Sequence, residues 1–185
     1  MRGSSAKSLN AVLAVVSGAS GVKKSAALGS ELLTVVAVLD REVALRRILT
    51  DPSTEAAGKK SLVAQVFGSS VNADTLAVLE AAAEGRWAAG RDLTDGLEIA
   101  GVAAWSQAAA ASKKGAGLES ELFAATQVIH DNAELRAVVS DRAVGIDGKE
   151  SLLKAIFSSK VSAPTLAILN QAAAARGGSF EKVIT

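Results

Sequence analysis

Few residues in this chain are suited to chemistry, and none stands in a pattern that a reaction requires. His130 is the only histidine among 185 residues, and there is no cysteine. No second ligand follows it at the spacing of a metal site, and the position 90 residues earlier is Asp40. We therefore interpret His130 as an exposed residue at a helix end rather than as a ligand or a general base.

Two short segments share the glycine–lysine pair that ends a phosphate-binding loop. They are Gly58-Lys59-Lys60-Ser61 and Gly148-Lys149-Glu150-Ser151. A P-loop also requires a glycine five residues earlier, a Ser or Thr directly after the lysine, and a preceding strand. Neither segment meets these requirements, so we interpret each as the first turn of a helix.

Asp92, Asp95 and Glu98 follow one another at intervals of three residues. Near a helix start, such a row is typical of a solvated face that complements the helix dipole. No segment of the sequence resembles a nucleophile–base pair. The sequence therefore predicts no catalytic, metal or cofactor site, and we expect the chain not to be an enzyme.

The overall composition argues against nucleic acid and the membrane interior as partners. Twenty Lys and Arg against 19 Asp and Glu leave a net charge of +1. This charge is too small to steer nucleic acid, and no aromatic residues interleave with the cations. No apolar run approaches the ~20 residues of a membrane span. The run from Leu9 to Val16 is short and interrupted by Asn10, so we interpret it as a helix and not as a signal peptide.

The two tryptophans, Trp87 and Trp105, are unusual in a chain with only four Phe and no Tyr. Tryptophan often anchors a partner at an interface. We favour the alternative that both are core residues flanking a helix that joins two parts of the chain.

The chain repeats itself at a spacing of 90 residues without a gap. Between Leu28 and Arg86, 23 of 59 positions are identical to the residue 90 further on, as direct comparison shows. Chance gives about one match in ten in so Ala-rich a chain, so the repeat is real. It predicts two domains of similar structure, 1–90 and 91–185.

The elements that carry these residues are all expected to be helices. Ala and Leu dominate, and these residues cost least in a helix. Apolar residues recur at helical spacing within Leu9–Val16, Leu28–Leu39, Leu45–Leu49, Leu62–Phe67 and a segment that starts near Asn72. The same pattern recurs 90 residues later. Residues 86–114 predict one long helix or two nearly continuous ones. We therefore expect an all-α protein with two tandem bundles of about six helices each.

With these elements in place, the chain resembles the delta subunit of bacterial F-type ATP synthase, a relative of the mitochondrial oligomycin-sensitivity-conferring protein. The similarity is greatest to the actinobacterial form, which has a duplicated N-terminal helical domain. The residues that carry it are Leu45-Arg46-Arg47-Ile48-Leu49-Thr50-Asp51-Pro52-Ser53, Arg86-Trp87, Arg91-Asp92-Leu93, Asp95-Gly96-Leu97-Glu98, Glu119-Ser120-Glu121-Leu122-Phe123, Glu134-Leu135-Arg136-Ala137, Ser140-Asp141-Arg142-Ala143, Lys160-Val161-Ser162, Pro164-Thr165-Leu166 and Arg176-Gly177-Gly178-Ser179-Phe180-Glu181. No single motif is diagnostic; the order and spacing together make the match specific.

The resemblance implies a stator part without an active site or cofactor. In the family, the first and fifth helices of the bundle grip N-terminal helices of alpha subunits and hold the catalytic head to the peripheral stalk. In the first repeat this implicates Leu9, Val12, Leu13 and Val16 with Leu76, Ala77 and Leu79. In the second repeat it implicates Val102 and Trp105 with Leu166, Ile168 and Leu169. Each repeat could then hold one alpha-subunit helix, in a groove that accepts an amphipathic helix.

The family also continues into a smaller C-terminal domain that meets subunit b of the stalk. We expect that domain to be absent from this chain, which would then be a shortened form of the subunit. The resemblance places the protein peripherally, at the cytoplasmic face of the cell membrane, as part of the synthase. The alternative is a tandem helical-repeat scaffold that binds other proteins outside the synthase.

Overall fold

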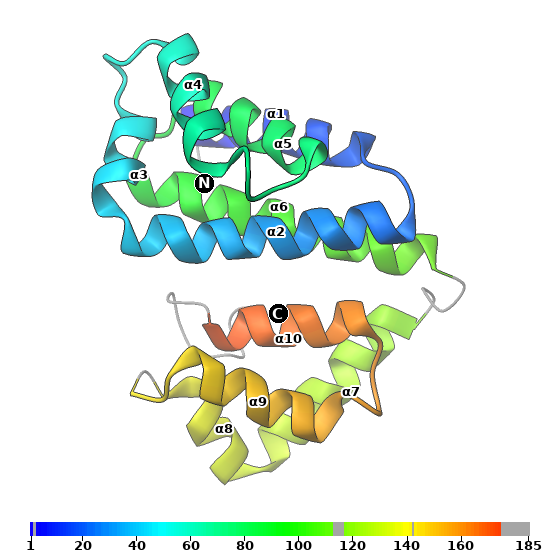
Figure 1. Cartoon of the computed structure of the whole chain (residues 1–185). Helices are drawn as coiled ribbons and strands as arrows, with labels where there is room; N and C mark the ends of the chain where they lie inside the picture. The colour runs from blue at the N-terminus through cyan, green and yellow to red at the C-terminus, as the bar shows by residue number, and fades with distance from the viewer. Residues whose placement is uncertain (2, 113–116, 142, 175–185) are drawn as a thin grey trace. The chain divides into compact units, whose positions relative to one another are not determined.

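A computed structural model describes the chain except for residues 2, 113–116, 142 and 175–185. Within the described part there are ten helices and no strand, which confirms the all-α expectation. The helices are α1 Ser4–Gly18, α2 Val22–Arg41, α3 Val43–Thr50, α4 Ala56–Phe67, α5 Ala73–Glu84, α6 Gly90–Ala111, α7 Leu118–Asp131, α8 Ala133–Ser140, α9 Ile146–Phe157 and α10 Ala163–Ala174 (Figure 1). None of these helices is long and apolar enough to cross a membrane.

Local sequence explains where several of these helices begin and end. Asn72 caps α5, because its side-chain oxygen accepts a hydrogen bond of 2.9 Å from the backbone N–H of Thr75. Pro164 is the second residue of α10, where its missing N–H costs little. Asp51 follows α3 and accepts a 2.8 Å hydrogen bond from the backbone N–H of Ser53, which turns the chain away from the helix.

The chain folds into two compact units, Met1–Ala108 and Ala109–Thr185. In the first unit, apolar faces of α1 to α6 meet in one core. Its fully buried side chains include those of Val12, Leu28, Leu32 and Leu97. Helix α5 packs directly beside α1 and α4.

The second unit, over its described residues, has a smaller core contributed by α7 to α10. That core contains Ile129, Val139, Leu153, Phe157 and Leu169. Helix α10 packs against α9 and α7, and α7 packs against α8. The order of these four helices repeats that of α2 to α5.

Helix α6 is a single helix of 22 residues, one of the two forms that the sequence predicts for this region. Its glycines fit tight contacts within the first unit. A Cβ atom added at Gly96 would lie 2.7 Å from the Trp87 ring. One added at Gly101 would lie 2.7 Å from the Leu33 side chain. The glycines therefore let α6 approach its neighbours closely despite their low helix propensity.

The boundary between the compact units differs from the boundary between the sequence repeats, and α6 accounts for the difference. Residues 94–108 are the counterparts of α1, yet they lie in the first unit, so the compact units meet at residues 108 and 109 rather than at 90 and 91. The inner face of α6 includes Leu97 and Ala100. The residues 90 positions earlier, Lys7 and Asn10, are exposed on α1. The two related helices therefore bury different faces.

Candidate helix-binding surface

Two buried serines fix helix α1 in the first unit. The Ser5 hydroxyl donates a hydrogen bond to the Asp92 carboxylate and accepts one of 2.8 Å from the backbone N–H of Ala88. The Ser8 hydroxyl donates to the backbone carbonyl of Arg86 at 2.9 Å. Both serines are almost fully buried. These bonds hold α1 against the link between α5 and α6 and so fix its position beside α5.

Helices α1 and α5 correspond to the two helices that the family resemblance implicates in a helix-binding groove of the first repeat. The structure divides the residues expected to line that groove into a buried set and a surface set. Val12, Val16 and Leu79 are no more than 2% exposed and belong to the core of the unit. A partner could not reach them without opening the bundle.

The remaining predicted residues of this pair lie at the surface. Leu9 and Leu13 on α1 and Leu76 on α5 are half-buried and pack on the core with one side. Ala77 is exposed. Small and aliphatic side chains on two adjacent helices form the kind of surface on which an amphipathic helix packs.

The residues predicted for the second repeat are divided between the two units. Val102 and Trp105 lie half-buried on α6, within the first unit. Leu166, half-buried, and Ile168 and Leu169, both buried, lie on α10 in the second unit. Leu169 is part of the core of that unit.

Charged residues border the surface of α5. Lys60 on α4 lies 2.8 Å from the Glu84 carboxylate and 3.7 Å from that of Glu80. The hydrogen bond to Glu84 raises the pKa of Lys60 above its usual value, and the charges of both glutamates act in the same direction. Glu80 follows Leu76 by one helical turn, so this ion-pair network lies beside the apolar residues of α5.

The acidic row at the start of α6 is less solvated than the sequence suggests. Asp92 and Asp95 are half-buried, and Asp92 accepts the hydrogen bond from Ser5. Burial raises the pKa of Asp95, while the charge of Arg91 opposes that shift. Asp92 therefore links the start of α6 to α1, whereas the burial of the ionised Asp95 carboxylate costs stability at neutral pH.

The glycine–lysine segments both lie in the first turns of helices, as predicted from the missing P-loop features. Sequence reasoning missed that Lys59 and Lys149 are both buried. The Lys149 ammonium donates to the Ala173 carbonyl at 3.2 Å, near the end of α10. Burial lowers the pKa of Lys59. The signal that could have indicated this role is the identity of the two lysines across the repeat.

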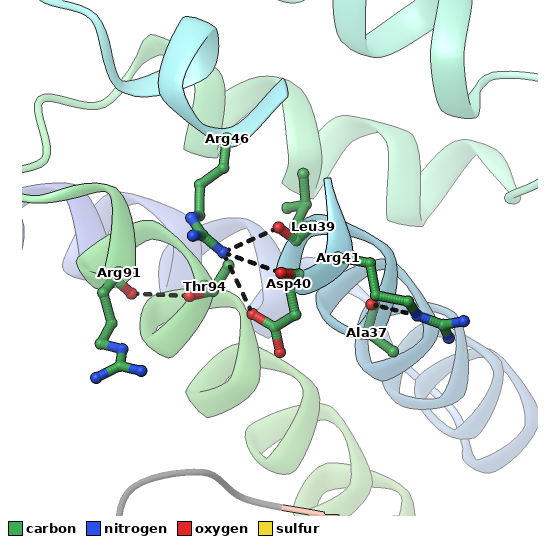
Figure 2. Close-up of polar contacts among 7 residues, drawn as sticks. All are labelled: Ala37, Leu39, Asp40, Arg41, Arg46, Arg91 and Thr94. Carbon is green, nitrogen blue, oxygen red and sulfur yellow. Dashed lines mark hydrogen bonds and ion pairs between the residues drawn. The ribbon is translucent and has the colours of Figure 1, made fainter. Parts of the chain in front are cut away.

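Another duplicated polar residue closes a helix end. One guanidinium nitrogen of Arg46 donates to the Leu39 carbonyl at 3.0 Å and lies 3.7 Å from the Asp40 carboxylate, at the end of α2 (Figure 2). Arg136 donates in the same way to the His130 carbonyl at the end of α7. The matched arginines therefore both bind carbonyl groups at helix C-termini.

The candidates for metal chemistry are not gathered by the fold. Among the residues that the structure describes, no group of three or more His, Cys, Asp or Glu side chains could hold a metal ion. His130 is exposed at the end of α7, as predicted, and its ring lies beside the neighbouring Asp131.

Fold and site together define a class: an all-helical protein, over its described residues, with apolar helix faces at its surface and its duplicated polar side chains at helix ends. No protein-family model matches the chain. Curated relatives do. The ATP synthase subunit delta of Nocardioides sp. is 36% identical over 186 residues, which cover 100% of this chain and 67% of the relative. That of Thermobifida fusca is 34% identical over 183 residues, 98% of this chain and 68% of the relative. That of Rhodococcus opacus is 35% identical, over 89% of this chain and 59% of the relative. The chain belongs to the ATP synthase delta subunit family, and it spans about three fifths to two thirds of the length of these relatives.

Proposed function

We propose that the chain is a non-catalytic stator part of a proton-translocating F-type ATP synthase, which grips the N-terminal helix of an alpha subunit on the surface of α1 and α5. The supporting observation is the row of apolar residues there that the core does not absorb. Leu9, Leu13 and Leu76 keep one side exposed, and Ala77 leaves room for a helix to approach. In this role the protein holds the catalytic head in place and catalyses no reaction itself.

The proposal extends to both sequence repeats. Each repeat, 1–90 and 91–185, would correspond to one delta-type helical bundle of about six helices, in a form with a duplicated N-terminal domain. The second repeat would bind a second alpha-subunit helix on α10, through the exposed side of Leu166. Its support is the identity of Leu76-Ala77 and Leu166-Ala167 across the repeat.

We expect the contact with the peripheral stalk to be made by the part of the relatives that this chain does not span. Contact with subunit b would be made mainly by the family's C-terminal domain. We place the protein peripherally at the cytoplasmic face of the cell membrane, assembled with the synthase and without inserting into the bilayer.

Isothermal titration calorimetry of the full chain with a synthetic peptide of the alpha-subunit N-terminus tests the proposal. We expect two peptides per chain. Ala77→Arg places a long side chain on the α1–α5 surface, and Ala167→Arg does the same on α10, so each variant should bind one peptide fewer. Ala64→Arg, at an exposed position of α4, is the matched control. Absence of heat would contradict the role in the synthase, and one peptide per chain would contradict the second site.

The competing scaffold outside the synthase is distinguished by co-purification. A tagged chain that serves as a stator should retain alpha subunits from a membrane extract, and Ala77→Arg with Ala167→Arg should release them. A scaffold of another pathway would retain none.

A further inference from the structure

Away from the α1–α5 surface, the first unit contains a pocket with an apolar wall and one carboxylate. It has a volume of about 350 Å³ and lies between α2 and the end of α4. Its apolar lining residues are Val35, Val38, Val66, Phe67 and Val71. This volume is at the lower end of ligand sites, so the pocket suits a short aliphatic chain rather than a large ligand.

Two polar side chains that line the pocket can only accept hydrogen bonds from a ligand. The Glu31 carboxylate already accepts one bond at each oxygen, from the backbone N–H of Asn72 at 2.8 Å and from its side-chain amide at 3.1 Å. Further lone pairs remain on both oxygens. The Thr34 hydroxyl donates its proton to the Ser30 carbonyl at 3.0 Å, so it too has only lone pairs to offer. A ligand that donates hydrogen bonds and is positively charged therefore matches this wall.

The corresponding pocket of the second unit contains a cation of its own. It has a volume of about 260 Å³, and both Glu121 and Lys160 line it. At the 90-residue spacing, Glu121 corresponds to Glu31, and Lys160 corresponds to Ser70, which lines the first pocket. The first pocket therefore has the carboxylate without the lysine. Within the described residues, Glu31 forms no ion pair, so its charge is available to a cation from outside the unit.

We propose that the first-unit pocket binds an aliphatic primary amine, with its hydrocarbon stem along the valines and Phe67 and its ammonium at the Glu31 carboxylate. A lysine side chain has this chemistry, because its stem packs on apolar surface while its ammonium stays at a polar edge. A free alkylammonium ion has the same chemistry. Hydrogen bonds between ionised groups are shorter and stronger than those between neutral ones, so the amine is preferred over an uncharged ligand of the same shape.

A nuclear magnetic resonance titration of the isotope-labelled full chain tests this proposal. The probes are n-hexylammonium and n-hexanol, which share the stem and differ in charge. We expect hexylammonium to shift the amide signals of Ser70 and Val71 in a saturable way and to bind about three- to tenfold more tightly than hexanol. The signals around Lys160 should not shift, because that pocket already has its cation.

Two variants provide the specific readout. Glu31→Gln keeps an acceptor for Asn72 but removes the charge, so hexylammonium should bind no more tightly than hexanol. Ser70→Lys gives the first pocket the cation that the second pocket has, and it should weaken hexylammonium binding about tenfold while Glu31 is unchanged. Ser70→Gln, neutral and long, controls for side-chain size. Glu55→Gln, at an exposed carboxylate outside the pocket, controls for net charge; both controls should keep the preference for the amine.

A further probe distinguishes the two sources of the amine. Binding of N-acetyl-lysine methylamide as tightly as hexylammonium assigns the pocket to a lysine of a partner protein, whereas binding of hexylammonium alone assigns it to free amines. Absence of saturable shifts overturns the proposal, as does equal affinity of the wild-type chain for hexylammonium and hexanol or an unchanged preference in Ser70→Lys. Circular dichroism verifies that each variant is folded. None of these results bears on the α1–α5 surface, because no residue of α1 or α5 lines the pocket.

Discussion

The contact between Gly29 on α2 and Trp105 on α6 allows a quantitative test of the packing in the first unit. A Cβ atom added at Gly29 would lie 2.6 Å from Cδ1 and 2.9 Å from Nε1 of the Trp105 indole. Carbon atoms in contact normally lie about 3.5–4.0 Å apart. Gly29→Ala therefore creates an overlap of about 1 Å against a rigid ring, and overpacking of this kind costs about 1–3 kcal/mol.

Helix propensity acts in the opposite direction and must be separated from this cost. An alanine inside a helix is favoured over glycine by about 1 kcal/mol, so Gly29→Ala alone should lower the free energy of unfolding by about 0–2 kcal/mol. Gly58→Ala on α4 is the matched control, because its nearest neighbour, the Thr54 methyl carbon, is 4.0 Å away. That change should stabilise the protein by about 0.4–1 kcal/mol. The difference between the two variants isolates the steric cost.

Urea denaturation monitored by tryptophan fluorescence measures this difference within one unit. Both tryptophans lie within Met1–Ala108, so the signal reports the unfolding of the first unit and not of the second. Adding Trp105→Leu to Gly29→Ala should recover most of the loss, since it removes the ring that the new methyl group meets. A Gly29→Ala variant as stable as Gly58→Ala would refute the packing of α6 on α2.

Three further predictions use the same assay. Asn72→Ala removes the N-cap of α5 and should cost about 1 kcal/mol; no loss would mean that the cap is dispensable. Burial raises the pKa of Asp95 above its ordinary 3.8, so its carboxyl stabilises the fold below pH 3.8 and loses this effect as the pH rises through the folded-state pKa. Asp95→Asn should therefore raise the urea midpoint at pH 7 but not near pH 3, and an equal gain at both would contradict the burial effect. Arg46→Met removes the charged donor at the end of α2 and should cost about 1.5–3 kcal/mol, whereas the exposed neighbour change Arg47→Met should remain within about 0.5 kcal/mol.

The helices could be predicted from sequence because their signals are local. Apolar spacing locates each described helix, and Asn72 and Pro164 mark two of the starts through side-chain and ring geometry within one turn. The duplicated Arg46 and Arg136 were interpretable as structural residues because both copies stand at equivalent helix ends.

The surface could not be predicted in the same detail because it depends on tertiary packing. Val12 and Leu13 are adjacent and similarly apolar, yet Val12 is fully buried while Leu13 keeps an exposed side. Only the neighbouring helices determine which of the two turns inward. The burial of Lys59 and Lys149 has the same origin, because a lysine pattern in a sequence normally indicates a solvated position.

The different faces that α1 and residues 94–108 bury have a consequence for how such a protein can evolve. Residues 94–108 make core contacts through positions whose counterparts on α1 are exposed. The boundary of the repeated segment, after residue 90, therefore differs from the boundary of the first folding unit, after residue 108. A recombination point at codon 90 would separate the first core from α6, which contributes Leu97 and Ala100 to it. One after codon 108 would transfer that core intact, so the viable modules for fusion and exchange are longer than the repeat.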